Sequence, residues 1–177
     1  MKASEFFTKE QQDQIREAIK KAEDTTSGEI RVHIETNLSG NVLDRAAWIF
    51  KRIGMHATAE RNGVLFYLAI TKRKFAVIGD QGINAKVAED FWDGIKKNLE
   101  KHFSTGKFTE GLVKGISMTG SQLREHFPFQ KNDINELPDD IEMEIGAALL
   151  AEVDEDEDED VSCFISKIDG DEITLDF

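Results

Sequence analysis

The chain has 177 residues, 40% of them hydrophobic, which is enough for a core and excludes disorder of the whole chain. Its net charge of −13 is unevenly distributed, because residues 1–132 hold 21 Lys and Arg against 17 Asp and Glu (+4), whereas residues 133–177 hold 1 against 18 (−17). The acidic end would repel phosphate groups, so nucleic acid is excluded as an expected partner.

Neither a disulfide nor a membrane segment is expected. Cys163 is the single cysteine, which fits a reducing compartment. The first residues lack an apolar run of signal-peptide length, and no stretch approaches the 18 or so apolar residues of a membrane span. We therefore expect a cytoplasmic protein that does not insert into a membrane.

The first third of the chain predicts a helix, a strand and a second helix. Thr8 and Gln11 have the spacing of a capping box, and apolar residues at helical spacing continue to about Asp24. Residues 30–35 alternate apolar and polar side chains, a pattern typical of a strand with one face buried. A second amphipathic helix is expected over residues 43–55.

The longest apolar run in the chain predicts a buried hairpin. Residues 61–70 and 74–83 are rich in β-branched and aromatic residues, and a short polar segment separates them. The helix before this hairpin connects two neighbouring strands, which implies a parallel pair, and the hairpin adds an antiparallel strand. We therefore predict an α/β fold with a small mixed sheet.

Two further helices and an acidic tail complete the chain. Helical spacing of apolar residues predicts helices over residues 86–103 and 108–126. Residues 129–160 are predicted to be an acidic, largely disordered linker, with at most a short helix over 141–150. Residues 161–177 alternate around an Asp-Gly pair and predict a β-hairpin.

The order of elements and four short motifs resemble the TPM domain family, in its short soluble bacterial form. The motifs are Thr26-Ser27-Gly28, Arg61-Asn62-Gly63-Val64-Leu65, Gly79-Asp80-Gln81-Gly82 and the segment from Phe103 to Leu112. The likeness covers residues 5–128 and implies a three-layer α/β/α sandwich with a small mixed sheet. The acidic tail lies outside it.

The family resemblance implies two functions of different classes. One is a binding or scaffold module, divalent-metal dependent, that acts with a membrane-associated or regulatory protein such as a LemA-type membrane protein. The alternative is a metal-dependent acid phosphatase that uses the region of Asp80, since such activity has been attributed to the plant members. A third interpretation makes the acidic tail itself the interaction element, presented by the folded body.

A metal site is predicted where the second strand of the hairpin ends. Asp80 lies there between Gly79 and Gly82, and Asp90 and Asp93 on the following helix could add oxygen ligands for Ca²⁺ or Mg²⁺. In the alternative interpretation Asp80 and Asn62 are turn residues and Asp90 only starts a helix.

The loop of Arg61, Asn62 and Gly63 precedes the neighbouring strand. We expect Asn62 at the other end of that strand, away from Asp80.

For a phosphatase the sequence offers little support. Cys163 lacks a Gly-rich phosphate loop, and the four histidines lack a metal-binding spacing. Catalytic residues are therefore unassigned.

Overall fold

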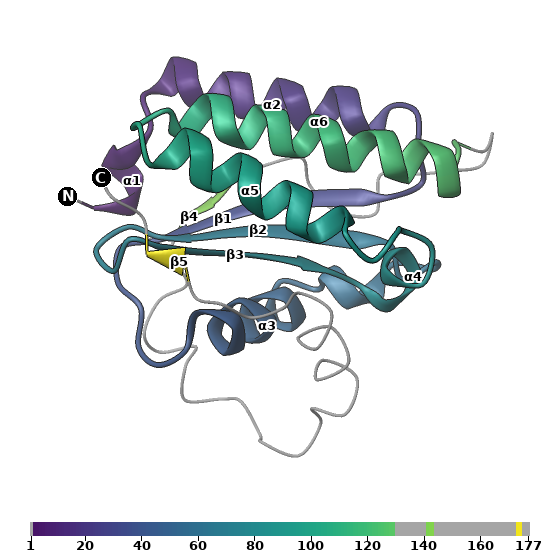
Figure 1. Cartoon of the computed structure of the whole chain (residues 1–177), viewed down its shortest axis with the longest axis horizontal. Helices are drawn as coiled ribbons and strands as arrows, with labels where there is room; N and C mark the ends of the chain where they lie inside the picture. The colour runs from purple at the N-terminus through teal and green to yellow at the C-terminus, as the bar shows by residue number, and fades with distance from the viewer. Residues whose placement is uncertain (1, 130–140, 144–172, 175–177) are drawn as a thin grey trace.

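A mixed β-sheet lies between two layers of helices (Figure 1). The computed structural model describes residues 2–129, 141–143 and 173–174. The helices are α1 (Ala3–Phe6), α2 (Lys9–Glu23), α3 (Val42–Arg52), the short 3-10 helix η1 (Met55–Ala57), α4 (Gln81–Asn84), α5 (Phe91–Phe103) and α6 (Phe108–His126). The strands are β1 (Glu29–Glu35), β2 (Gly63–Ala69), β3 (Lys74–Gly79), β4 (Ile141–Met143) and β5 (Ile173–Thr174).

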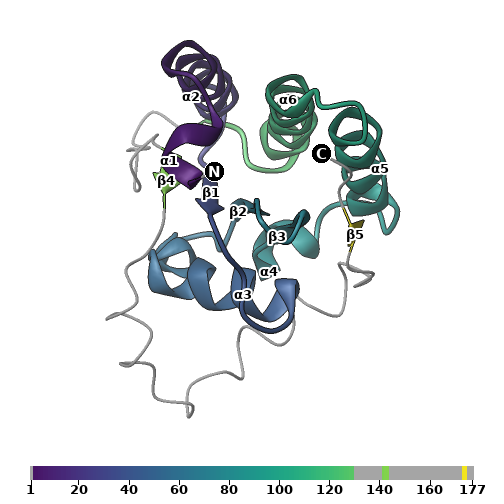
Figure 2. The ribbon, with the colours of Figure 1, turned by 90° about the vertical axis from the view of Figure 1, so that its left-hand side faces the viewer.

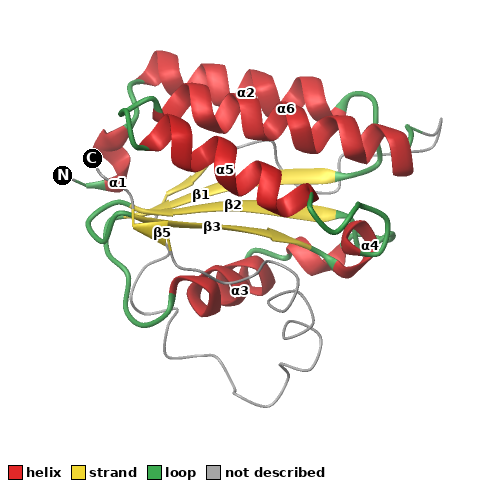
Figure 3. Cartoon of the chain, in the orientation of Figure 1, coloured by secondary structure: helices red, strands yellow, loops and turns green. Residues whose placement is uncertain are grey.

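The two faces of the sheet bury two separate apolar clusters. Helices α2, α5 and α6 cover one face and α3 covers the other, as the view along the strands in Figure 2 shows. The larger cluster lies beneath the three helices and includes Phe66 and Phe103, and the smaller includes Phe50 and Ile78 beside α3. Figure 3 shows the same three layers. The predicted α/β/α sandwich is thus confirmed.

The sheet is mixed, with one parallel and one antiparallel pair at its centre. Within the described residues the sheet has the order β4-β1-β2-β3-β5. Strands β1 and β2 are parallel, with α3 as the crossover, and β2 and β3 form the expected antiparallel hairpin, in which Val64 pairs with Gly79. The starts of β1 and β2 and the end of β3 therefore lie at the same edge of the sheet.

The prediction that only one face of β1 is buried is wrong. All seven residues of the strand are buried, including the polar ones. Glu35 accepts hydrogen bonds from Arg45 Nε at 3.0 Å and from Tyr67 Oη at 2.7 Å, so its carboxylate is paired beneath α3. Alternating polar side chains predict an exposed strand face only if no neighbouring element supplies hydrogen-bond partners that allow those side chains to be buried.

The pKa of Glu35 records this pairing. Burial alone would raise the pKa of the carboxyl, but the neighbouring His33 ring and the hydrogen bonds from Arg45 and Tyr67 outweigh burial and lower it to about 2. Burial and the neighbouring Glu35 charge raise the pKa of Tyr67. Both residues therefore keep their neutral-pH forms, carboxylate and phenol, over a wide pH range.

Two predicted boundaries are corrected. The helix predicted over residues 86–103 begins at Phe91, because residues 85–90 form turns between the short helix α4 and α5. Residues 141–143 form β4, paired in parallel with β1, where at most a helix was expected. Ile173–Thr174 pairs with β3. The rest of the predicted linker and of the 161–177 hairpin lies outside the described residues.

Candidate functional site

Three of the four sequence motifs meet at one edge of the sheet, which we call the polar corner. It comprises Ser27, Glu60, Arg61, Asn62 and Asp80. Ser27 lies just before β1, the next three just before β2, and Asp80 directly after β3. The expectation that Asn62 lies away from Asp80 is wrong, because the antiparallel hairpin places the start of β2 beside the end of β3.

Asp80 is fully buried and both of its carboxylate oxygens are engaged. Arg61 Nε donates to Oδ2 at 2.9 Å, and the backbone N–H of Gln81 donates to Oδ1 at 2.7 Å. Burial raises the pKa of Asp80, and the hydrogen bond from Arg61 opposes that change. Asp80 is the N-cap of α4, a structural role, although the alternative interpretation expected a turn residue here.

Asn62 links the loop before β2 to the residue before β1. Its side-chain Nδ2 donates to Ser27 Oγ at 3.2 Å, and its backbone N–H donates to Thr58 Oγ1 at 3.2 Å. Ser27 Oγ in turn donates to a carboxylate oxygen of Glu60. The buried Oδ1 of Asn62 has no hydrogen-bond partner within the described part of the chain.

The glycines of the corner permit close backbone packing. The N–H of Gly82 donates to the carbonyl of Arg61 at 2.8 Å, and a Cβ at Gly82 would overlap the carbonyl oxygen of Glu60. Arg61 itself adopts the left-handed region, with a φ of +52°. The carbonyl of Gly63 accepts from the N–H of Asp80 at 2.9 Å, and a Cβ at Gly79 would overlap the ring of Trp92.

The predicted metal ligands do not form a ligand set. Asp90 and Asp93 are exposed at the start of α5, whereas Asp80 is buried and paired. Asp90 is the N-cap residue of α5 but its side chain makes no capping hydrogen bond. No group of three His, Cys, Asp or Glu able to hold a metal ion occurs among residues 2–129, 141–143 and 173–174. These residues therefore do not fit a divalent cation, although metal dependence stays a prediction.

Sequence reasoning missed Ser27 and Glu60 as members of the corner. The signal for Ser27 was the Thr26-Ser27-Gly28 motif ahead of the first strand, whereas nothing in the sequence pointed to Glu60. Thr26 is structural, since its hydroxyl contacts the carbonyls of Leu123 and Phe127 at the end of α6. The corner as a whole fastens the connections at this edge of the sheet.

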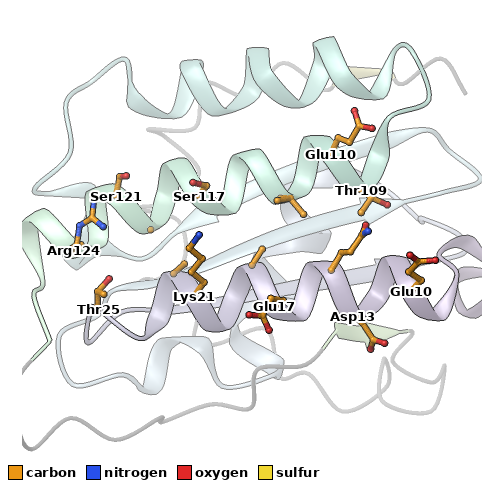
Figure 4. A pocket seen from close by; sticks show the side chains of 15 residues that line it. Glu10, Asp13, Glu17, Lys21, Thr25, Thr109, Glu110, Ser117, Ser121 and Arg124 are labelled. Atoms are coloured by element: carbon orange, nitrogen blue, oxygen red, sulfur yellow. The ribbon is translucent and has the colours of Figure 1, made fainter.

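A groove lies on the outer surface of the helical layer, between α2 and α6, and sequence reasoning missed it entirely. The two helices run side by side in the same direction (Figure 4). The groove has a volume of about 890 Å³. Its lining residues are Glu10, Asp13, Gln14, Glu17, Ala18, Lys21, Ala22 and Thr25 on the α2 side, and Thr109, Glu110, Val113, Ser117, Gly120, Ser121 and Arg124 on the α6 side.

Small side chains form the middle of the groove. Its central lining includes Ala18, Ala22, Ser117 and Gly120. A Cβ at Gly120 would lie 2.7 Å from the Cβ of Ala22, which shows how closely the two helices approach. With no long apolar side chain across the middle, the surface between the helices stays hollow.

The charges of the groove are separated along its length. The carboxylates of Glu10, Asp13 and Glu110 lie in the half nearer the start of the two helices, Glu17 lies near the middle, and the cations of Lys21 and Arg124 lie in the other half (Figure 4). Asp13 pairs with Arg16 at 3.0 Å. Within the described residues, the other five have no ion-pair partner.

Comparisons with known proteins agree on one family. The sequence pattern of the TPM domain matches residues 1–122. The chain is similar to the solved BA42 protein of the psychrophilic bacterium Bizionia argentinensis, with 44% identity, a TM-score of 0.74, and coverage of 80% of this chain and 97% of that one.

The N-terminal domain of a P. gingivalis protein shares the fold, with 18% identity, a TM-score of 0.59, and coverage of 72% of this chain and 84% of that one. A comparison with curated proteins gave no match. Of the helices that the structure describes, none is long and apolar enough to span a membrane.

Proposed function

Because this chain belongs to the TPM domain family, we propose that it is a binding module that acts through a protein partner and that its binding surface is the groove between α2 and α6. The observation that carries the proposal is the groove itself. It is large enough for a segment of polypeptide, and the side chains that line its centre are short and mostly uncharged. Its charged side chains are exposed and, apart from Asp13, lack partners among the described residues.

The polar corner supports binding over catalysis. A general base or nucleophile must reach its substrate, and Asp80 is buried with both oxygens engaged by Arg61 and Gln81. The metal-dependent phosphatase stays the alternative, with no observation in its favour from the geometry around Asp80.

The family resemblance suggests the identity of the partner. LemA-type membrane proteins accompany bacterial relatives, so we propose a protein of this type as the partner. Its soluble part would occupy the groove while the chain itself stays outside the membrane.

A photo-crosslinking residue at Ser117 tests the proposal. Ser117 is exposed in the middle of the groove, and Lys97 on α5 is an exposed control position outside it. With the purified soluble part of a LemA-type protein, we expect a covalent adduct from position 117 and none from position 97. Equal adducts from both positions, or none from position 117, would remove the groove from the proposal.

A further inference from the structure

Resting on the proposed function, we infer that the groove takes an amphipathic α-helix of the partner that runs antiparallel to α2 and α6. The partner helix carries acidic residues near its N-terminus, small residues along its centre and basic residues near its C-terminus. Three features of the groove lead to this description: its shape, its separated charges and the direction of its two helices.

The shape of the groove suits a helix better than an extended strand. A strand binds by continuing the hydrogen bonds of a sheet edge, and the backbone groups of α2 and α6 are already used within the helices. Between Glu110 and Arg124 the groove is roughly 20 Å long at 1.5 Å per residue, which matches about four helical turns. The small central residues, such as Ala18 and Ser117, allow a third helix to approach closely.

The charges of the groove define the two ends of its occupant. The carboxylates of Glu10 and Glu110 favour cations at one end, and Lys21 and Arg124 favour anions at the other. Acidic residues near the start of a helix and basic ones near its end also stabilise that helix itself. That effect accounts for the charges at the ends of each helix, and because α2 and α6 run in the same direction, it places like charges of both helices at the same end of the groove.

The direction of the partner follows from its own dipole. A helix is most stable with acidic residues at its N-terminus and basic residues at its C-terminus. Placed over the groove, such a helix matches the charges only when its acidic start lies over Lys21 and Arg124 and its basic end over Glu10 and Glu110. It then runs opposite to α2 and α6, so the helix dipoles also attract.

The negative charge of the groove also argues against two other occupants, the chain's own acidic tail and an anionic membrane surface. The groove holds four carboxylates against two cations. Residues 133–177 hold 18 acidic residues against 1 basic residue, and anionic lipid is equally negative. Both would be repelled from the half of the groove nearer Glu10, so the partner helix is the occupant that matches its whole length.

A designed probe helix tests the inference with the full chain. The probe is an alanine-rich peptide of about 20 residues with glutamates in its first two turns and lysines in its last two. We expect saturable amide shifts confined to α2 and α6. We also expect binding to weaken about fivefold in Glu17→Lys, and by less than twofold in the matched control Glu89→Lys, an exposed residue outside the groove.

A spin label on the C-terminus of the probe reports its direction. Line broadening is expected for amides near Glu10 and Glu110. Broadening near Arg124 instead, equal weakening in both variants, or no saturable shift would overturn the inference. A partner that still crosslinks from Ser117 in any of those cases would leave the proposed function standing, whereas loss of that crosslink would overturn both.

Discussion

The polar corner and the groove between α2 and α6 place polar side chains in opposite situations. In the corner, Asp80 is fully buried and is paired with Arg61 and the start of α4. In the groove, Glu10, Glu17 and Glu110 are exposed and have no ion-pair partner among the described residues. The corner therefore stabilises the fold, and the exposed charges of the groove are the ones that we propose for contact with another molecule. The motif residues and the residues that we propose for binding are therefore different residues.

Removing the carboxylate of the corner should have the largest effect. In Asp80→Ala the Arg61 guanidinium loses its hydrogen bond to the buried carboxylate and α4 loses its cap, so we expect a loss of about 3 kcal/mol in the free energy of unfolding, measured with urea. Asp90→Ala is the matched control, because Asp90 is exposed and makes no capping hydrogen bond, and should change stability by less than about 0.5 kcal/mol. Similar losses in both variants would contradict the role of the corner.

Glu35 extends the comparison to a second buried carboxylate, on β1. Its pKa is lowered from 4.5 to about 2, so its contribution to stability is fully present above pH 4.5 and is lost as the pH falls toward 2. We expect about 2–3 kcal/mol to disappear over this window, and the loss to be absent in Glu35→Gln.

Urea unfolding at a series of pH values measures this contribution. The pKa of Asp80 is raised, so that group acts in the opposite sense. For this reason the difference between the wild type and Glu35→Gln is the quantity to compare. Parallel pH profiles of the two proteins would contradict the pairing of Glu35.

Substitution of two glycines compares a position that is closely packed against the backbone with one that has room for a side chain. Gly82→Ala should destabilise by about 1–3 kcal/mol, because its Cβ overlaps the backbone oxygen of Glu60 and lies 2.6 Å from that of Arg61. Gly94→Ala on α5 should stabilise by about 0.5–1 kcal/mol, because the nearest atom of another element to its Cβ, the methyl carbon of Met118, is 4.0 Å away. Thermal unfolding of both variants gives the comparison, and equal signs would contradict it.

The smallest expected response is to divalent cations. Titration with Ca²⁺ and Mg²⁺ should produce no saturable amide shifts over residues 79–93, because Asp80 is paired and Asp90 and Asp93 are exposed and scattered. Loose, salt-like shifts in the acidic tail serve as the internal reference. Saturable shifts at residues 79–93 that vanish in Asp80→Ala would restore the metal site.

Much of the fold could be predicted from local patterns. The capping box of Thr8 and Gln11, the crossover helix and the hairpin are all encoded within a few residues, and all are confirmed. The errors arise where contacts with another element of the fold determine the structure of a segment. Burial of Glu35 depends on Arg45 and Tyr67, and the strand at Ile141–Met143 depends on the free edge of β1.

The candidate site was predictable only in part. The motif residues Arg61 and Asp80 were found, but their pairing depends on the register of the hairpin, which brings together two loops that are 19 residues apart in the sequence. The groove was not predictable, because its two walls are about 100 residues apart in the chain and carry ordinary surface residues such as Glu17 and Ser117. No sequence motif indicates that the surfaces of these two helices lie side by side.

An amide spectrum of the full chain, titrated with the acidic-to-basic probe helix, tests the central claim most directly. The account predicts saturable shifts along α2 and α6, between Glu10 and Thr25 and between Thr109 and Arg124, with the amides of Arg61 and Asp80 unchanged. Shifts that gather around Arg61 and Asp80 while the two helices stay silent would place binding at the polar corner and contradict the account.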